Sequence, residues 1–175
     1  MTEKPEIAQL GADILRQQAR EVDDFSCPKF LALLETLQAV MLESNGVGIA
    51  APQIGASWQV VIIASRPTAR YPHAPDMSPV IMVNPSFQVL NANRRKDWEG
   101  CLSVPGIRAL VPRYQSVRVN YQNALGQHEQ MILDDFPARV FQHEFDHLQG
   151  LVYLDRLESN RDIVSETEFF KRIAA

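Results

Sequence analysis

The feature that most constrains this chain is segment 143–147, His-Glu-Phe-Asp-His, which has the pattern H-E-x-x-H. Four residues advance an α-helix by about 400°, so both imidazoles project from one helix face and can bind one metal ion. Glu144 follows the first histidine and can reach a metal-bound water without being a ligand. The motif therefore predicts a helix that carries two metal ligands and an acid/base group. The alternative is a surface helix with two ordinary polar histidines.

Two histidines do not complete a catalytic metal site, which needs three protein ligands and an open position. Glu166 and Glu168 lie 19 and 21 residues after His147, an offset at which gluzincin proteases place a ligating glutamate. Cys101 lies 42 residues before His143, and a thiolate is a strong ligand for a borderline-soft divalent ion. The other interpretation of Cys101 is a small buried apolar side chain. The residues alone leave these candidates for the third ligand open.

Composition indicates one ordinary globular domain, residues 1–175, with 46% apolar residues and too few cysteines for a disulfide scaffold. The net charge of -4 argues against a phosphate-binding surface, so no direct binding to nucleic acid is expected. No apolar run approaches the roughly 18 residues of a membrane span. The acidic N-terminal region is unlike a signal or transit peptide. We therefore expect a cytoplasmic protein with no membrane segment.

Hydrophobic periodicity predicts an α+β fold, because short strands and a few helices occur without βαβ alternation. Helices are expected at 28–41 and 137–149, a last amphipathic segment within 159–175, and a short turn or helix within 7–20. Strands are expected at 58–65, 80–83, 86–90, 116–122 and 128–133, with a surface loop at 66–79 and a turn at 124–126.

Two further motifs precede the histidine motif, GVGIAAPQIG at 46–55 and EGCLS at 99–103, and the third reads QHEFDHLQG at 142–150. In this order the three motifs resemble the signature motifs of the peptide deformylases, and the resemblance spans residues 46–154. It implies antiparallel sheets packed around a central H-E-x-x-H helix. It also implies a hydrolase that removes the formyl group from the initiator methionine of nascent polypeptides and releases formate.

The resemblance assigns roles to individual residues, each by its place in a motif. Cys101, His143 and His147 correspond to the metal ligands, and Glu144 corresponds to the general acid/base. Gln53, through its amide, and Leu102, through its backbone N–H, correspond to the pair that stabilises the oxyanion. Iron(II) is the family's usual metal, with zinc or nickel as possible replacements.

The expected partner is an N-formyl-Met nascent peptide. Gly46 and Gly48 leave the backbone accessible, so an extended peptide can pair there as an added strand. Val47, Ile49, Leu102 and Val140 are expected to line an apolar pocket for the methionine.

Two charged features remain. Many family members dock on the ribosome through a basic C-terminal helix, but segment 155–172 has four basic and five acidic residues. We therefore do not expect ribosome docking through this segment. Asp146 and Arg113 are expected to form either an ion pair near the site or a solvated surface pair.

Overall fold

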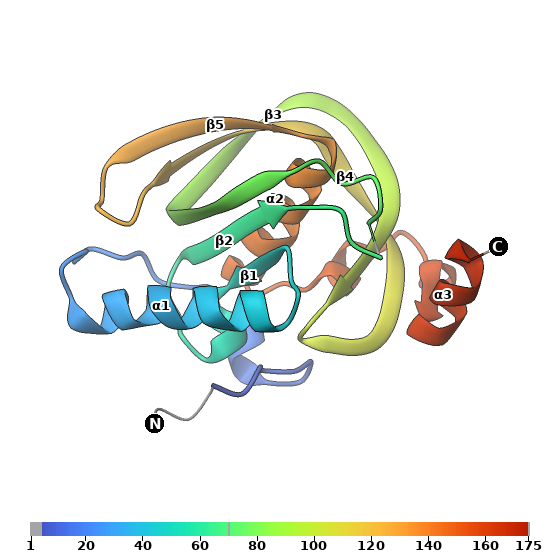
Figure 1. The fold of residues 1–175 in the computed structure, drawn as a ribbon, viewed down its shortest axis with the longest axis horizontal. Coiled ribbons are helices and arrows are strands. Elements are labelled where there is room, and N and C mark those ends of the chain that lie inside the picture. Colours follow the sequence, from blue (N-terminus) through green and yellow to red (C-terminus); the bar gives the residue numbers. More distant parts are fainter. Residues whose placement is uncertain (1–4, 70, 175) are drawn as a thin grey trace.

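A computed structural model describes residues 5–69 and 71–174. Within these residues, three α-helices accompany one six-stranded sheet whose strand pairings are all antiparallel (Figure 1). The helices are α1 (Pro28–Glu43), α2 (Asp135–Leu148) and α3 (Glu166–Ile173). The strands are β1 (Gly48–Ala50), β2 (Val60–Ser65), β3 (Met77–Cys101), β4 (Val104–Gln122), β5 (His128–Asp134) and β6 (Ile163–Ser165). The α+β prediction is confirmed, with one sheet in the described residues in place of several.

Strand order follows the chain from β1 to β5, and β6 pairs with β4 outside this path. β1 is consequently an edge strand, as the expected pairing with an extended peptide requires. In the part of the chain that the structure describes, no helix is both long and apolar enough to span a membrane.

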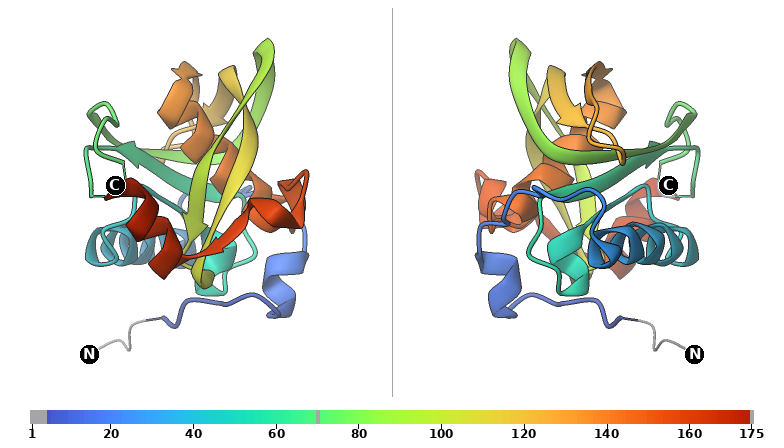
Figure 2. Two further views of the ribbon diagram at one scale, coloured as in Figure 1. Left: turned by 90° about the vertical axis from the view of Figure 1, so that its right-hand side faces the viewer. Right: turned by 90° about the vertical axis from the view of Figure 1, so that its left-hand side faces the viewer.

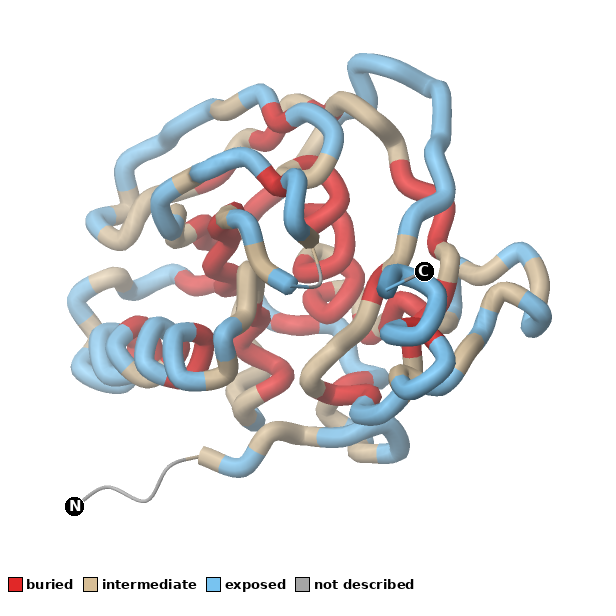
Figure 3. The backbone as a smooth tube through the Cα atoms, turned by 45° about the vertical axis from the view of Figure 1, so that its right-hand side comes forward, coloured by how far each residue is buried: buried red, intermediate tan, exposed pale blue. Residues whose placement is uncertain are grey.

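Helix α2 lies in the interior and is buried along most of its length (Figure 3). Its apolar residues Ala138, Phe141 and Leu148 pack against inward-facing residues of the sheet. Polar residues of the helix are buried as well, among them His143 and His147. A surface helix with ordinary polar histidines is therefore excluded.

Strand β2 lies between two layers of apolar side chains. Val61 and Ile63 pack with residues of α2, whereas Val60 and Ile62 pack with residues of α1. Successive side chains of a strand point to opposite faces, so a strand covered on both faces is apolar throughout. This explains the uninterrupted apolar run that predicted the strand.

The long β3–β4 hairpin corrects the sequence prediction. Segments 80–83 and 86–90 belong to one strand that begins at Met77 and continues to Cys101, so the predicted loop 66–79 is too long. Asn84 separates the two segments because it has a left-handed φ of 49° and the register shifts beside it. The polar stretch that follows has no alternating pattern, and its pairing with β4 holds it as a strand.

The chain ends also differ in detail from the prediction. A 3₁₀ helix at Asp13–Arg16 is the short element expected within 7–20. The C-terminal segment, expected to hold one amphipathic element within 159–175, divides into a 3₁₀ turn, β6 and α3. Ser165 ends the strand and begins α3, since its hydroxyl accepts a hydrogen bond from the Glu168 N–H. Gly150 follows α2 with a φ of 73°, as expected for a helix C-terminus.

Candidate metal centre and its cavity

Three candidate ligands come together from two elements. Cys101 is the last residue of β3, and Leu102 and Ser103 form the two-residue connection to β4. His143 and His147 lie one turn apart on α2. One ligand atom from each of the three residues lies within 4.8 Å of the other two, and the Cys101 Sγ lies 3.3 Å from the His147 Nε2.

These three residues fit a divalent metal ion. A thiolate and two imidazoles are a common donor set for zinc and related ions, and three protein ligands leave a position open for a reactant. Burial opposes ionisation of Cys101, yet His147 and His143 hold the pKa of its thiol well below the usual value. The donor set therefore offers an anionic sulfur beside two imidazole nitrogens.

The alternative third ligands do not reach this group. Glu166 forms an ion pair with Arg108, and Glu168 forms an exposed pair with Lys171. Among the described residues, Cys101 is the third member of the cluster that contains the two histidines. A gluzincin-like arrangement is thus wrong for this chain.

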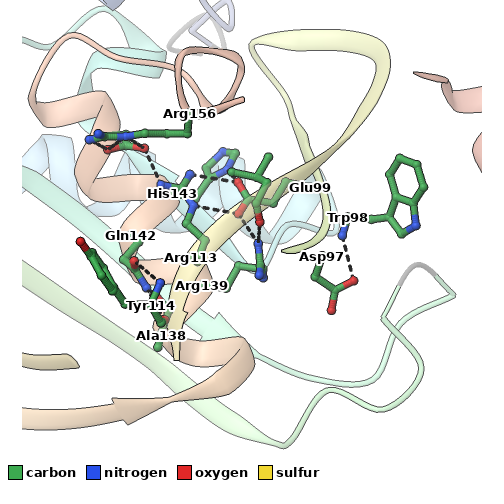
Figure 4. Close-up of polar contacts among 12 residues, drawn as sticks. Asp97, Trp98, Glu99, Arg113, Tyr114, Ala138, Arg139, Gln142, His143 and Arg156 are labelled. Carbon is green, nitrogen blue, oxygen red and sulfur yellow. Dashed lines mark hydrogen bonds and ion pairs between the residues drawn. The ribbon is translucent and has the colours of Figure 1, made fainter. Parts of the chain in front are cut away.

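A buried ionic network orients His143 (Figure 4). The His143 Nδ1 lies 2.8 Å from one oxygen of Glu99, and Arg113 binds both oxygens of that carboxylate at 2.9 and 3.0 Å. Arg139 donates to the other oxygen at 2.9 Å. Burial raises the pKa of Glu99, but Arg113 and His143 reverse this and hold it far below its usual range. An ionised Glu99 accepts the Nδ1–H, which leaves Nε2 of His143 available to a metal ion.

The network continues to a second buried carboxylate. Arg113 also donates to Asp146 at 2.6 Å, and the half-exposed Arg156 donates to the same carboxylate. The expected pairing of Asp146 with Arg113 is confirmed, in the buried form and not as a solvated surface pair.

Glu144 lies beside the two histidines on α2, and its carboxylate is buried. It is 5% exposed, and its Oε2 is buried without a hydrogen-bond partner among the described residues. Burial raises the pKa of Glu144 to about 7, although His143 and His147 act in the opposite direction. A buried carboxyl with a pKa near neutrality is suited to accept and return a proton.

Gln53 is held in one orientation by its neighbours. Its Oε1 accepts a hydrogen bond from the Ala50 N–H at 2.9 Å. Its Nε2 donates to the Ser103 hydroxyl at 3.2 Å and lies 3.4 Å from the Cys101 Sγ. The amide N–H₂ therefore faces the candidate metal centre, while the carbonyl side is occupied by backbone.

A cavity of about 570 Å³ opens onto this group. The predicted residues that line it are Gly46, Val47, Gly48, Gln53, Cys101, Leu102, Val140, His143 and Glu144. His147 is fully buried and does not line the cavity.

The expectation for the side chain of Ile49 is wrong. Ile49 is fully buried in the apolar cluster of α1 and does not line the cavity. The physical reason is strand alternation: Gly48 and Ala50 face α2, so the side chain between them faces α1.

Sequence reasoning missed several residues of the site. Glu99 stands two residues before Cys101 on the same strand, and that spacing places both on one face, which is a usable signal. Arg139 precedes His143 by four residues on the helix, a second such signal. Tyr153 stacks on the His143 ring at 5.7 Å between ring centroids, and no sequence pattern indicates that contact.

The chain is similar to known proteins both in sequence and in fold. A family model described as polypeptide deformylase matches residues 4–162. The chain is 47% identical to peptide deformylase 2 of a Nostoc species over 163 residues, 93% of this chain and 91% of the relative. It is 49% identical to peptide deformylase 2 of Shewanella oneidensis over 86% of this chain and 82% of the relative.

A solved structure is similar over nearly the whole chain. It is a class I type b peptide deformylase from Acinetobacter baumannii with Met-Ala-Ser bound. The TM-score is 0.86 at 42% sequence identity, and the match covers 90% of this chain and 100% of the solved one.

Proposed function

Because this chain belongs to the peptide deformylase family, and thus removes the N-formyl group from nascent polypeptides, we propose that Cys101, His143 and His147 hold the metal ion that this family uses. The observation that carries the proposal is the convergence of one sulfur and two imidazoles from β3 and α2 within 4.8 Å. We propose iron(II) as the ion in the cell, with zinc or nickel as replacements. The order of affinities favours zinc over iron, so availability would decide which ion is loaded.

The bound ion would supply positive charge that polarises the formyl carbonyl and makes water more acidic. Glu144 accepts a proton from the attacking water as the new C–O bond forms at the formyl carbon. It then passes the proton to the leaving nitrogen as the C–N bond breaks, which yields formate and a free amino terminus.

The oxyanion of the tetrahedral intermediate requires donors that are oriented before the reaction. The Gln53 N–H₂ group faces the centre because its carbonyl side is held by Ala50, and Leu102 lines the cavity next to Cys101. We assign the Gln53 amide and the Leu102 N–H to this role. Removing one such donor typically costs about 100- to 1,000-fold in turnover.

The peptide is proposed to bind as an extended strand beside β1. The edge position of β1 and the small residues Gly46 and Gly48 support this arrangement. Val47 and Val140 line the cavity and supply apolar contacts for the methionine. The Met-Ala-Ser bound to the Acinetobacter protein is what remains of formyl-Met-Ala-Ser after deformylation, which supports the same substrate here.

We also propose a cytoplasmic location for this protein, because its substrates are made during translation. The net charge of -4 supports an absence of direct nucleic-acid contact, and the near-neutral segment 155–172 offers no basic surface for ribosome docking. We also propose that residues 1–175 form a single domain.

The test combines turnover with metal content. Protein purified without oxygen is expected to release formate from formyl-Met-Ala-Ser and to contain about one metal ion per chain. Cys101→Ala is expected to lose most of the bound metal and its activity, whereas Cys27→Ala, which changes the other cysteine, should retain both. Equal metal content in the two variants would contradict the assigned ligand set.

A further inference from the structure

The C-terminal segment reaches the cavity from outside the residues that the family model matches, which end at 162. β6 pairs with β4 through Ile107–Ala109, and this pairing sets α3 beside the lower part of the β3–β4 hairpin (Figure 2). Glu166, the first residue of α3, lines the same cavity as Glu144. The segment thus contributes a carboxylate to the space where the peptide is expected to bind.

Arg108 is the partner of this carboxylate. It is 6% exposed, lines the cavity and forms an ion pair with Glu166. Its guanidinium lies 5.7 Å from the centroid of the Phe169 ring and passes over Gly100, where any Cβ would overlap it. The Arg108 Nε is buried and has no hydrogen-bond partner among the described residues. A buried cation that is so incompletely satisfied needs a nearby anion.

Glu166 is more exposed than the other carboxylates of the cavity. Its side chain is 36% exposed, while Glu99 and Glu144 are buried. Glu99 is bound by arginines and Glu144 belongs to the reaction centre, so neither is available to a substrate side chain at the mouth. Glu166 is therefore the carboxylate of this cavity that a substrate side chain can reach.

We propose that Glu166 sets the charge preference of the cavity for substrate side chains that follow the methionine. The inference rests on the proposed function, because it places an extended formyl peptide in this cavity. With Glu166 present, the charge of Arg108 is compensated and an acidic side chain meets a carboxylate. A basic side chain is attracted by the same group. Without Glu166, the uncompensated Arg108 attracts acidic side chains instead.

The experiment compares kcat/KM for C-terminally amidated peptides that differ in charge at the second or third residue. The peptides are formyl-Met-Ala-Ser, formyl-Met-Ala-Lys, formyl-Met-Ala-Glu, formyl-Met-Lys-Ala and formyl-Met-Glu-Ala. Glu166→Gln is the test variant. Glu168→Gln is the matched control, because it removes the same charge from the same helical turn but does not line the cavity.

The parent protein is expected to prefer lysine over glutamate at one of the two positions. Glu166→Gln should lower that lysine-to-glutamate ratio about fivefold at low salt, the typical worth of one partly exposed charge. Glu166→Lys should lower it further. Glu168→Gln should leave the ratio unchanged. The ratio is taken within each variant, so an effect of the substitution that is common to all peptides cancels. Raising the salt concentration should weaken the effect, as screening requires.

Equal changes in Glu166→Gln and Glu168→Gln would indicate a general effect of net charge and overturn the inference. An unchanged ratio in both Glu166 variants, with normal cleavage of the serine peptide, overturns it while leaving the proposed function intact. Failure of the parent protein to cleave the serine peptide would refute the proposed function itself, and the inference with it.

Discussion

Glu144 and Gly48 show how closely strand β1 approaches the H-E-x-x-H helix. A Cβ atom at position 48 would overlap the carboxylate of Glu144, so only glycine allows this approach. The carboxylate is therefore confined between β1 and the cavity, and its Oε2 has no hydrogen-bond partner in the described residues. The close packing thus holds the Glu144 carboxylate in place but leaves its Oε2 free of a hydrogen bond within the described residues, so that it can accept a proton.

Replacing Glu144 with glutamine tests the role of this carboxylate. The amide has nearly the same shape but cannot accept the proton of the attacking water, so turnover should fall by about 100- to 10,000-fold. Metal content should remain close to that of the parent, because Glu144 is not a ligand. The measurements are formate release and metal analysis of the same preparation. A variant that retained more than about a tenth of the activity would refute the acid/base role.

At the scale of elements, helix α2 is clamped to the β3–β4 hairpin by buried arginines. Arg139 donates to backbone carbonyls of both strands, Arg95 O at 2.6 Å and Val111 O at 2.7 Å. Arg113 on β4 joins Glu99 of β3 to Asp146 of α2. Because Cys101 ends β3 and the histidines lie on α2, this clamp sets the distance between the ligands.

Arg113→Met should therefore destabilise the fold strongly. It leaves the carboxylates of Glu99 and Asp146 buried with fewer partners, and breaking a buried ion pair from one side typically costs about 3–5 kcal/mol. The control is Arg16→Met, which removes a partly exposed pair with Asp155 and should cost at most about 1 kcal/mol.

Urea denaturation of the metal-free proteins measures both variants, so loss of the ion does not contribute. Similar unfolding free energies for the two variants would show that the buried network does not hold α2 to the hairpin.

At the scale of the whole molecule, the candidate ligands connect parts of the chain that are far apart in sequence. A metal ion that binds the folded state alone stabilises it by mass action, by about 2.7 kcal/mol when free ion is a hundredfold above Kd. For a chain of this size that corresponds to a rise in Tm of about 5–10 °C.

Thermal unfolding with and without a chelator checks this expectation. The parent protein should show the full difference in Tm between its loaded and metal-free forms. Cys101→Ala should show little or none, because it lacks one of the three ligands. An identical Tm for the parent in both conditions would mean that the ion does not bind this site tightly.

The local parts of the site were accessible from the sequence because they depend on one element at a time. The spacing of His143 and His147 places both imidazoles on one helix face wherever that helix lies. Pro137 and Gly150 located the ends of α2 to within two residues for the same reason, since the helix begins at Asp135 and ends at Leu148. The order of the three motifs was sufficient to indicate the family and, through it, Cys101.

Only the tertiary structure decided which distant residues meet. Cys101, Glu166 and Glu168 all remained possible third ligands from the residues alone, and the β3–β4 hairpin brings Cys101 to the histidines while β6 directs Glu166 to Arg108. Ile49 turned away from the cavity because α1 covers that face of β1. The reason is common to these cases: a side chain's partners depend on how whole elements pack, and no local spacing encodes that packing.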